Sequence, residues 1–503
     1  MTMRHSTPVR GLTSAKTSPL FQGRFGRMFR TLPPATFGAN DAENGKNLAA
    51  LGAAMSSDFD PPKDGLDDEE SGIPALYTYL GQFIDHDITF DPASSLQQQN
   101  DPDALIDFRT PALDLDNVYG RGPDDQPYLY DDTGKSFLLG DPLSGGDPNA
   151  KDLPRNNATT RRALIGDPRN DENAIVSQLQ GLLHRFHNRT VADNASLEFK
   201  DIQKLVRFHY QYVVLNDFLP RIVHSSVIAA LKTGNQYDPH KLRFFHWKHE
   251  PFMPVEFSVA AYRLGHSMIR PGYRLNDSDL TLLPIFPVPS QGLKEGLTGF
   301  RAMNPHWGID FGRFIDIDRR NNDGTPADQK KRLQFAYRID TSLVNPLSGL
   351  PPAVASNPSS LPERNLLRGW RMGLPSGQNV ARAMNVKPMA DTDILIGKGV
   401  DKPDAPLPNI VSVSKIFAGN CPLWTYVLAE AMHFQETVKI PVNEDVSVTT
   451  PRLGPVGGRI VAEVLIGLLA GDPNSLLNLD PDWQPKIGPT FALKDFIGYA
   501  LGR

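Results

Sequence analysis

The 503-residue sequence has almost no cysteine, with Cys421 as its single thiol. One thiol cannot form a disulfide within the chain, so the fold depends on a core rather than on covalent cross-links. Long hydrophobic runs are also missing, and the longest late apolar stretch, 460–470, is too short to cross a bilayer. The N-terminus lacks the apolar run of a signal peptide. We therefore expect no membrane span, and a cytoplasmic protein or one secreted by a leaderless route.

The sequence also has little charge imbalance. A net charge of −5 gives no reason to expect nucleic acid or an acidic membrane as a partner. A hydrophobic content of 40% is ordinary for a globular protein. Length alone suggests about three domains, but we find no clear linker, fixed-period repeat or low-complexity tract. We therefore expect an N-terminal arm over residues 1–45 and one large domain over residues 46–503, with a monomer favoured.

Apolar spacing predicts a mainly α fold with little β structure and long ordered loops, the longest over 91–168. Pro74 suits the first turn of one expected helix, and Pro271 lies just beyond the end of another. A third helical region is expected to be interrupted near Pro220. The expected helices cover residues 73–87, 173–192, 201–231, 254–269, 327–338, 363–371, 411–418, 422–436 and 457–470.

The most informative segment is Gly-Gln-Phe-Ile-Asp-His-Asp-Ile-Thr-Phe at residues 81–90. Gln82, Asp85 and His86 have the spacing i, i+3, i+4, so on a helix they project from one face. Asp87 lies about 100° further round and can serve a different site. A capped, solvated helix end and a chemical site explain these residue types equally well.

His266 lies in a second informative segment, Tyr-Arg-Leu-Gly-His-Ser-Met-Ile-Arg-Pro. Taken alone, a lone histidine on an apolar face is usually a core residue hydrogen-bonded to backbone. A haem iron, however, needs one strong axial ligand, commonly an imidazole nitrogen. Apolar residues that could pack against a porphyrin surround it, namely Val259, Ala260, Leu264 and Ile269.

A third segment, Thr-Pro-Ala-Leu-Asp-Leu-Asp-Asn-Val-Tyr-Gly, begins at Thr110. An extended loop would point its alternate oxygens, at 110, 112, 114 and 116, in one direction. Such hard oxygen ligands suit Ca²⁺. A lone Asp-x-Asp is weak evidence, but a metal ion here would have a purpose if it fixed the nearby helix that carries His86.

These motifs together resemble the haem peroxidases of the peroxidase–cyclooxygenase superfamily, the relatives of myeloperoxidase and lactoperoxidase, which include bacterial members. Gln-Phe-Ile-Asp-His-Asp is similar to their distal-histidine motif, and the resemblance covers roughly residues 20–470. It implies a single large helical haem-peroxidase domain that holds haem b and Ca²⁺. It also implies reduction of hydrogen peroxide, with oxidation of halides, thiocyanate or small aromatic donors, and a role in the response to oxidative stress.

The resemblance also implies a role for each matching residue. His86 would be the distal acid and base, Arg169 would stabilise charge on the peroxide, and Gln82 would orient water or halide. His266 would be the proximal iron ligand. Asn365 would accept or share the proton on the far ring nitrogen of His266, and Arg368 would lie near a haem propionate. Arg263 corresponds to the arginine of the proximal-histidine motif. The calcium ligands would be Asp87, Thr110, Ala112 through its carbonyl, Asp114 and Asp116, where Asp116 replaces the serine of many relatives.

Two carboxylates, Asp85 and Glu172, match positions that form ester bonds to haem methyl groups in the family, so the resemblance implies covalently attached haem. Asn173 stands where myeloperoxidase has a methionine that makes a third link, and that link cannot form here. Bromide, iodide, thiocyanate and phenols are therefore better donor candidates than chloride. A competing explanation for Glu172, and for Asp171, is an ordinary acid at a helix N-terminus.

Three alternatives remain open at this point. A fatty-acid dioxygenase of the cyclooxygenase branch would have a tyrosine three residues before the proximal histidine. This chain has Arg263 there and Tyr262 one place further back. A non-catalytic haem- or calcium-binding protein is the second alternative. A different metal site is the third, on His184 and His187 or on His246 and His249, although no further ligands are evident.

Overall fold

The structure is a computed structural model, and it describes residues 23–90, 99–100, 106–107, 109–320, 325–355, 357–400, 405–440 and 443–503. The fold is mainly helical, with 40% helix and 12% strand in one domain. The expected fold class is therefore confirmed. The part of the expected arm over 1–22 lies outside the described residues, and the boundary at 45 stays a prediction.

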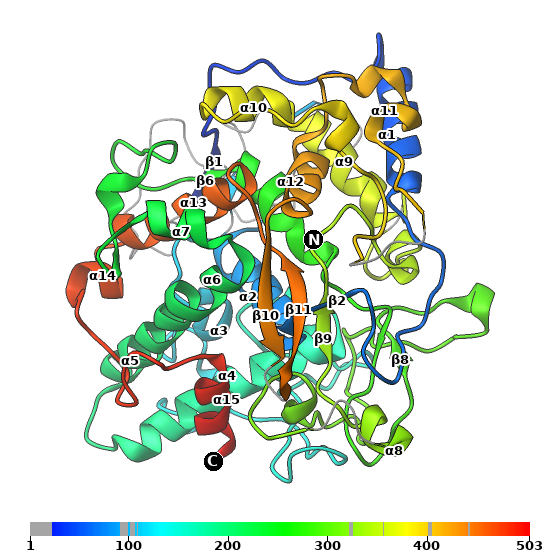
Figure 1. Cartoon of the computed structure of the whole chain (residues 1–503). Helices are drawn as coiled ribbons and strands as arrows, with labels where there is room; N and C mark the ends of the chain where they lie inside the picture. Colours follow the sequence, from blue (N-terminus) through cyan, green and yellow to red (C-terminus); the bar gives the residue numbers. More distant parts are fainter. Residues whose placement is uncertain are drawn as a thin grey trace.

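The α-helices range from one turn to 20 residues, and Figure 1 labels many of them. They are α1 Asp41–Ala54, α2 Leu76–Ile88, α3 Asp116–Tyr119, α4 Ala174–Asp193, α5 Phe199–Val213, α6 Leu219–Ile222, α7 Ser225–Ala230, α8 Pro326–Lys330, α9 Leu361–Arg371, α10 Gly377–Ala383, α11 Ile410–Val413, α12 Leu423–Ala431, α13 Gly457–Gly471, α14 Leu476–Leu479 and α15 Leu493–Leu501.

Shorter helical segments of 3₁₀ or π type join these helices. The 3₁₀ segments are η2 Pro127–Leu129, η3 Pro168–Asp171, η5 Pro239–Lys241, η7 Ala261–His266, η8 Pro289–Gln291, η9 Phe311–Arg313, η10 Asn345–Ser348, η11 Asp391–Asp393 and η12 Lys415–Phe417. The π segments are η4 Val214–Phe218 and η6 Glu256–Ala260.

The strands are short and lie between the helices. They are β1 Gly23–Gly26, β2 Glu70–Pro74, β3 Ile106–Asp107, β4 Lys232–Thr233, β5 Gln236–Tyr237, β6 Met253–Pro254, β7 Gly272–Tyr273, β8 Leu283–Pro284, β9 Phe335–Tyr337, β10 Gln435–Ile440 and β11 Asn443–Pro451. Strand β1 pairs antiparallel with β3 and parallel with β6, while β2 with β9, β4 with β5, β7 with β8 and β10 with β11 form antiparallel pairs.

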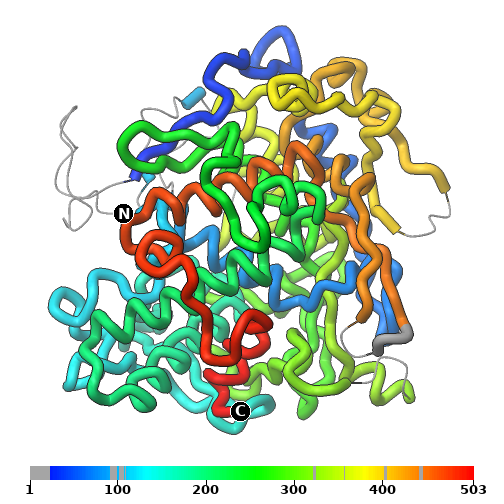
Figure 2. Tube along the Cα trace, turned by 60° about the vertical axis from the view of Figure 1, so that its left-hand side comes forward, coloured from blue at the N-terminus to red at the C-terminus, as the bar shows by residue number. Residues whose placement is uncertain are grey.

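The β10–β11 hairpin packs beside β2 and was not expected from the sequence (Figure 1). In the turned view of Figure 2 this orange hairpin runs along one side of the molecule. Gly72 of β2 has φ +74, and a Cβ there would lie 2.3 Å from Val448 of the hairpin. Only glycine accepts both the left-handed backbone and this close approach.

Helix α2 lies in the middle of the molecule, between the group formed by α1, α9, α10 and α12 and the group formed by α4, α5 and α15 (Figure 1). It packs on α4 and η7. Its apolar residues are at most 3% exposed, so this helix is a core element on nearly every side. They include Leu76, Leu80, Phe83, Ile84 and Ile88.

The expected helices over 173–192, 363–371 and 457–470 are present, close to the predicted bounds, as α4, α9 and α13. Others differ. Residues 73 and 74 belong to β2, so Pro74 ends a strand instead of starting a helix. Residues 327–338 divide into α8 and β9, and the segment 422–436 ends as the start of β10. In each case pairing with a distant strand outweighs local helical propensity.

The 201–231 region is divided as expected near Pro220, which lies in the first turn of α6. The segment 411–418 forms α11 and η12 rather than one helix. Helix α1 starts at Asp41, inside the expected arm, and α15 is a C-terminal helix that the sequence analysis missed. Helix α1 is capped by the Asn40 side chain, which accepts from the Glu43 N–H at 3.0 Å.

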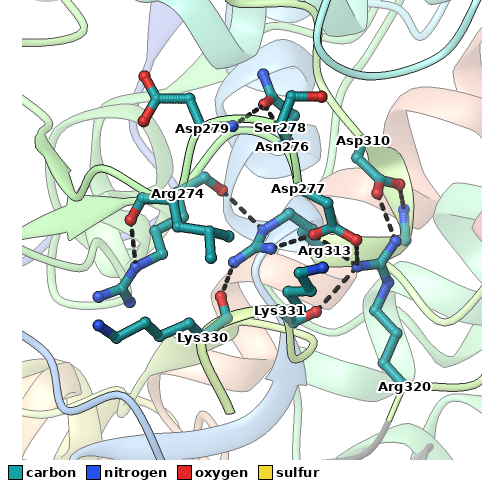
Figure 3. A network of polar contacts seen from close by, with 12 residues as sticks. Arg274, Asn276, Asp277, Ser278, Asp279, Asp310, Arg313, Arg320, Lys330 and Lys331 are labelled. Carbon is teal, nitrogen blue, oxygen red and sulfur yellow. Dashed lines mark hydrogen bonds and ion pairs between the residues drawn. The ribbon is translucent and has the colours of Figure 1, made fainter. Parts of the chain in front are cut away.

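A polar network joins the loops between β7 and β9 and fixes where α2 begins (Figure 3). Arg313 is 1% exposed, and its guanidinium donates to Asp277 and to the backbone oxygens of Arg274 and Lys330. The residue after it, Phe314, accepts a hydrogen bond from the N–H of Leu76 at 2.9 Å. The start of α2 is therefore tied to this network.

Candidate active site

Helix α2 carries four polar side chains in its last two turns. Gln82 and Asp85 are half-buried, His86 is 5% exposed and Asp87 is fully buried. A solvated helix end therefore does not explain this segment. Thr89, just past the helix, donates its hydroxyl to the Asp85 carbonyl at 3.0 Å and so satisfies one of the last carbonyl groups.

His86 is held by the loop that precedes α4. Its Nδ1 lies 2.7 Å from Oδ1 of Asn170, a residue of η3 that is fully buried. An amide oxygen can only accept, so Nδ1 carries the ring proton and Nε2 is left as a base. Burial and the nearby Arg169 lower the pKa of His86 to about 4. The ring is therefore neutral at ordinary pH.

Arg169 lies beside His86 and is fixed on several sides. Its Nη2 donates to the backbone oxygens of His86, at 3.0 Å, and Thr89, at 2.6 Å. The same nitrogen donates to Asp167 at 2.8 Å, and the guanidinium stacks 4.6 Å from the Phe90 ring centre. The side chain keeps 22% of its surface accessible. A fixed cation thus stands next to a neutral base.

Glu172 and Gln82 contact each other across this site. Gln82 Nε2 donates to Glu172 Oε1, and Asn173 Nδ2 donates to Gln82 Oε1 at 3.3 Å. Burial raises the pKa of Glu172 to about 7, although Arg169 and Gln82 act to lower it. Asn173 also caps α4, accepting from two backbone N–H groups at 3.0 Å. The neighbouring acid Asp171 instead pairs with Arg155, so its place is structural.

His266 is the last residue of η7, and α9 supplies its partner. Nδ2 of Asn365 lies 2.8 Å from Nδ1 of His266. Arg263 donates to Asn365 Oδ1 at 3.0 Å, which turns the amide so that its nitrogen faces the ring. Burial and the Arg263 charge lower the pKa of His266 to about 3. Arg368 lies one turn further along α9 and is half-buried.

The segment before His266 is not the α-helix expected over 254–269. It is a π turn followed by a 3₁₀ helix, with a break at Ala260 where φ is −129° and ψ is −79°. The Glu256 carboxylate, at the start of the π turn, accepts from the backbone N–H groups of Met28 and Phe29. Tertiary contacts of this kind change the helical pitch, and π turns are frequent at functional sites.

Each of the two histidines has one ring nitrogen that a cofactor could use. Neither Nε2 makes a hydrogen bond to any residue that the structure describes. A Cβ added at Gly265 would meet no atom within 4 Å. Gly265 and His266 are half-buried, and the adjacent Leu264 is buried. Burial is nevertheless the largest cause of the lowered pKa of the His266 ring. These features fit a haem between His86 and His266.

Three carboxylates meet where α2 lies against the loop 114–116. Oxygens of Asp87, Asp114 and Asp116 lie within 4.8 Å of one another. Burial raises the pKa of all three, and each is raised further by a neighbouring carboxylate; for Asp116 the value is about 6. Asp87 Oδ1 is buried and accepts no hydrogen bond from a described residue. A divalent cation would remove this repulsion, and the all-oxygen donor set suits Ca²⁺.

The loop bearing two of these carboxylates is bent, not extended as we expected. Leu115 has φ 62° and ψ 33°, a left-handed conformation that is uncommon for a bulky residue. The turn brings Asp114 and Asp116 together, and the Leu115 N–H donates to Asp87 Oδ2 at 3.3 Å. The neutral oxygens of Thr110 and Ala112 in the same loop stay predicted ligands. Stored strain of this kind is typical of ligand loops.

Arg109 and Asp167 connect the carboxylate cluster to the distal side, and the sequence analysis missed both. Arg109 Nη1 lies 3.2 Å from Asp116, and its Nε donates to Asp167 at 2.9 Å. Asp167 in turn holds Arg169. Burial acts to raise the pKa of Asp167, but Arg169 and Arg109 keep it below its ordinary value. Arg109 directly precedes Thr110 and Asp167 lies two residues before Arg169, yet residue type alone gave no reason to pair them.

The alternative histidine metal sites are not assembled among the described residues. Nε2 of His184 lies 2.8 Å from Gln180, and both ring nitrogens of His187 are used, by Tyr119 at 2.9 Å and by the Lys135 carbonyl at 2.7 Å. The cluster of Asp87, Asp114 and Asp116 is the one potential metal group found in the described part of the chain, so His246 and His249 join none.

Comparison with known proteins shows what part of this chain is similar to. Residues 94–287, which include Arg169 and His266, match the family model described as animal haem peroxidase. This part of the chain is similar to the animal haem peroxidases. Thyroid peroxidase of Sus scrofa is 28% identical over 222 residues, 37% of this chain and 23% of that protein. Peroxidasin of Drosophila melanogaster is 25% identical over 317 residues, 58% of this chain and 19% of that protein.

The chain spans less than a quarter of the length of each of these two curated proteins. Its fold is also similar to solved structures. Peroxidase A of Dictyostelium discoideum gives a TM-score of 0.61 at 16% identity, covering 96% of this chain and 94% of that one. A fatty acid alpha-dioxygenase of Arabidopsis thaliana gives a TM-score of 0.52 at 14% identity, covering 93% and 76%. These two likenesses show the fold alone. No described helix is long and apolar enough to cross a membrane.

Proposed function

We propose that this protein is a haem peroxidase that binds haem b between His86 and His266 and reduces hydrogen peroxide. The observation that supports this most strongly is the pair of buried histidines. Each is held through Nδ1 by an asparagine, and each leaves Nε2 without a partner among the described residues. The family match supports the cofactor, because haem supplies the redox chemistry of such enzymes.

The distal residues have the chemistry that cleavage of a peroxide needs. Nε2 of His86 accepts the proton from the near peroxide oxygen and returns it to the far oxygen, as a general base and then an acid. The Arg169 guanidinium stabilises negative charge on the departing oxygen, and its contacts to Asp167 and two carbonyls keep it in place. Gln82, held by Glu172 and Asn173, orients a water or halide beside His86.

On the proximal side, Arg263 and Asn365 fix the ring of His266. Because the Asn365 amide donates to Nδ1, the neutral ring carries its proton on Nε2, and an iron ion there would take the place of that proton. The ring would then be an electron-rich ligand. Arg368 is proposed to bind a haem propionate. Ca²⁺ on Asp87, Asp114 and Asp116, with Thr110 and Ala112, would fix α2 beside the haem.

We further propose that Asp85 and Glu172 form ester bonds to haem methyl groups. Asp85 lies one turn after Gln82 on α2, and Gln82 donates to Glu172, so the two carboxyl groups belong to one part of the molecule. Each ester replaces a methyl hydrogen with a carboxyl oxygen and releases two protons and two electrons, which reduce one hydrogen peroxide to two waters. Acidified organic solvent should not extract intact haem after peroxide treatment; full extraction would contradict the ester proposal.

The donors we propose are bromide, iodide, thiocyanate and phenols. Asn173 is engaged in capping α4 and in holding Gln82, so it contributes no third haem link of the kind a methionine would provide. Fatty-acid oxygenation is the second candidate, and the alpha-dioxygenase fold likeness gives it a reason. Against it, Arg263 occupies the position of the required tyrosine. The nearby Tyr262 is instead stacked on Phe257 with ring centres 4.5 Å apart.

The experiment that tests the function compares peroxide-dependent donor oxidation with fatty-acid consumption. Protein saturated with haem is mixed with hydrogen peroxide and bromide or a phenol, and separately with a long-chain fatty acid and oxygen. We expect donor oxidation that is lost in Arg169→Leu, and no oxygen uptake with fatty acid. Oxygen uptake without donor oxidation would favour the dioxygenase, and neither activity with bound haem would leave a non-catalytic binding protein.

A further inference from the structure

A chain of buried hydrogen bonds extends from the distal histidine into α4. His86 Nδ1 contacts Asn170 Oδ1 at 2.7 Å, Asn170 Nδ2 donates to Gln180 Oε1 at 2.8 Å, and Gln180 Nε2 lies 2.8 Å from Nε2 of His184. Asn170 and Gln180 are fully buried and His184 is 2% exposed. The chain therefore runs from one imidazole to another without contact with bulk water.

The donors and acceptors along this hydrogen-bond chain all follow one order. An amide presents an acceptor at one end and a donor at the other, so fixing one bond fixes the next. With Asn170 Oδ1 toward His86, Gln180 must present its oxygen to Asn170 and its NH₂ to His184. The ring of His184 must then accept through Nε2 and carry its own proton on Nδ1. In this arrangement His86 has its proton on Nδ1 and a free Nε2.

The same atoms allow one other consistent arrangement. If both amides are turned over, His184 donates from Nε2 to Gln180, and the Asn170 NH₂ group donates to His86 Nδ1. The proton of His86 then lies on Nε2, which is no longer a base. The proton position on His184 and that on His86 are thus coupled through two amide groups, although the two rings do not touch.

The hydrogen-bond chain ends at His184. Its Nδ1 is buried and has no hydrogen-bond partner among the described residues. Its ring is stacked on Phe137 with centres 4.3 Å apart and an angle of 10° between the planes, which holds it in place. His184 lies four residues after Gln180, so both project from one face of α4 and the short contact follows from the helix itself.

We propose that His184, Gln180 and Asn170 are positioning residues that set which nitrogen of His86 carries the ring proton. This rests on the proposed function, in which a free Nε2 on His86 is required. His184 acts by accepting from Gln180. Without that acceptor the Gln180 NH₂ group would be a buried, unpaired donor, and turning the amide over would replace it with a less costly unpaired oxygen.

The decisive variants are His184→Phe and His184→Gln. Phenylalanine keeps a flat ring against Phe137 but cannot accept, whereas glutamine restores an acceptor. His187→Phe is the matched control, because His187 lies on the same helix, is fully buried and also contacts Phe137, but is not part of the chain. A variant that merely disturbs the packing of α4 would behave like this control.

The first readout needs no haem. In full-length haem-free protein labelled with ¹⁵N in its histidine rings, the signals of His86 are assigned by their loss in His86→Gln, and the two ring nitrogens report where the proton is. We expect the His86 proton on Nδ1 in the unaltered protein, in His184→Gln and in His187→Phe. In His184→Phe we expect a substantial shift toward Nε2.

The second readout uses the protein saturated with haem. We expect the rate of reaction with hydrogen peroxide to fall about tenfold in His184→Phe, corresponding to the loss of one buried hydrogen bond. The subsequent oxidation of the donor should be unchanged. In an Asn170→Asp background, where a carboxylate accepts from His86 regardless of Gln180, adding His184→Phe should have no further effect on this rate.

Two results would overturn the proposal: an unchanged His86 proton position in His184→Phe, or an equal change in His187→Phe. If the protein proves not to bind haem, the second readout disappears while the first still decides whether the chain sets the His86 proton. Failure of the proposed function and failure of this inference are therefore separate outcomes.

Discussion

The two histidines of the site are held by the same kind of contact with opposite polarity. Asn170 presents its oxygen to His86 Nδ1, while Asn365 presents its nitrogen to His266 Nδ1. In the first case the ring keeps a free lone pair on Nε2, as a base needs. In the second the ring proton lies on Nε2, where a metal can replace it. Both partners are asparagines, and the group at the far end of the amide decides which end faces the ring. Gln180 Oε1 accepts from Asn170, whereas Arg263 donates to Asn365.

The first prediction concerns the base. His86→Gln removes a proton acceptor from beside Arg169, so the rate of reaction with hydrogen peroxide should fall by roughly 10²–10⁴-fold. Stopped-flow absorbance of the haem-loaded protein measures it. The exposed His240→Gln serves as the control and should leave the rate unchanged. A loss of less than tenfold in His86→Gln would show that another group takes the proton.

From the sequence, roles could be proposed for the site residues, and Asn365 could be named as the partner of His266. The partners of His86 and Arg169 could not be named. His86, Arg169 and His266 were proposed from motifs, because each motif is local. Asn170, Asp167 and Arg109 were missed because their contacts join segments that are 58–84 residues apart. The polarity of an amide depends on what its far end meets, and a sequence does not contain that information.

At the scale of elements, α2 depends on loops that are distant in sequence. The Arg313 guanidinium is held by Asp277 and by carbonyls on two segments, and the adjacent Phe314 and Gln334 carbonyls accept from the first residues of α2 and from Ala75 before it. Because the guanidinium is buried, water cannot readily replace the groups that it contacts. This network therefore contributes to placing Gln82, Asp85 and His86.

The second prediction tests this network. Arg313→Met leaves the Lys330 carbonyl without its donor and leaves Asp277 with Arg320 alone. The free energy of unfolding should therefore fall by about 1–3 kcal/mol. Denaturant unfolding followed by fluorescence measures it. Arg319→Met, an exposed arginine of the same segment, should change the free energy by less than about 0.5 kcal/mol. Equal effects of the two substitutions would show that Arg313 does not have this role.

Glu430, at the end of α12, joins this helix to α13. Its carboxylate accepts from the backbone N–H groups of Val456 and Gly457 at 3.0 Å, and burial nevertheless raises its pKa to about 7. The folded state therefore binds its proton more tightly than the unfolded state, whose pKa is near 4.5. Protonation of Glu430 favours the fold, and ionisation disfavours it.

The third prediction follows from the raised pKa of Glu430 in the folded state. As pH rises from 4.5 to 7, the folded state holds a proton that the unfolded state has lost, so this group lowers stability across that window by on the order of 3 kcal/mol. Glu430→Gln should flatten the pH dependence of the free energy of unfolding by that amount. The solvent-exposed Glu295→Gln is the control. An unchanged slope in Glu430→Gln would contradict a raised pKa.

Element type could be predicted where a segment interacts mainly with its own neighbours. Helix α4 has a capping asparagine, a regular apolar face and 20 residues, and its bounds differ from the prediction by one residue at each end. The segment before His266 has equally helical spacing, but Glu256 at its start is tied to Met28 and Phe29. The result is a π turn and a 3₁₀ helix, which periodicity cannot distinguish from an α-helix.

For the whole molecule, the carboxylate cluster brings three like charges close together. Asp87, Asp114 and Asp116 repel one another, and Arg109 is the cation that contacts the cluster, at 3.2 Å from Asp116. A bound cation would link α2 to the loop 110–116 and so stabilise the fold as a whole. The proposed haem site and the proposed metal site share the distal helix.

The fourth prediction concerns this metal. Ca²⁺ at a hundredfold excess over its dissociation constant should stabilise the protein by about 2.7 kcal/mol, which for a chain of this length raises the Tm by about 3 °C. Differential scanning calorimetry with Ca²⁺ and with a chelator measures the shift. Asp114→Asn should remove most of it, while Asp318→Asn, outside the cluster, should retain it. A shift that survives Asp114→Asn would place the ion elsewhere.

The fold class, and one large helical domain, were predictable from composition, periodicity and the family resemblance. The β10–β11 hairpin and its contact with Gly72 were not, because a glycine that makes room for a distant strand looks in the sequence like any other glycine. We expected the long loops. We did not expect an arginine network in these loops to support α2. Whole-molecule packing decides such features.

The central claim is a haem held between His86 and His266 that reacts with peroxide. Its most direct test is the ultraviolet–visible spectrum of haem-loaded protein before and after a few equivalents of hydrogen peroxide, and again after adding bromide or a phenol. The account predicts a Soret band that shifts with peroxide and returns with the donor, and that is lost or strongly altered in His266→Ala. A Soret band that does not respond to peroxide, or no band after haem addition, would contradict it.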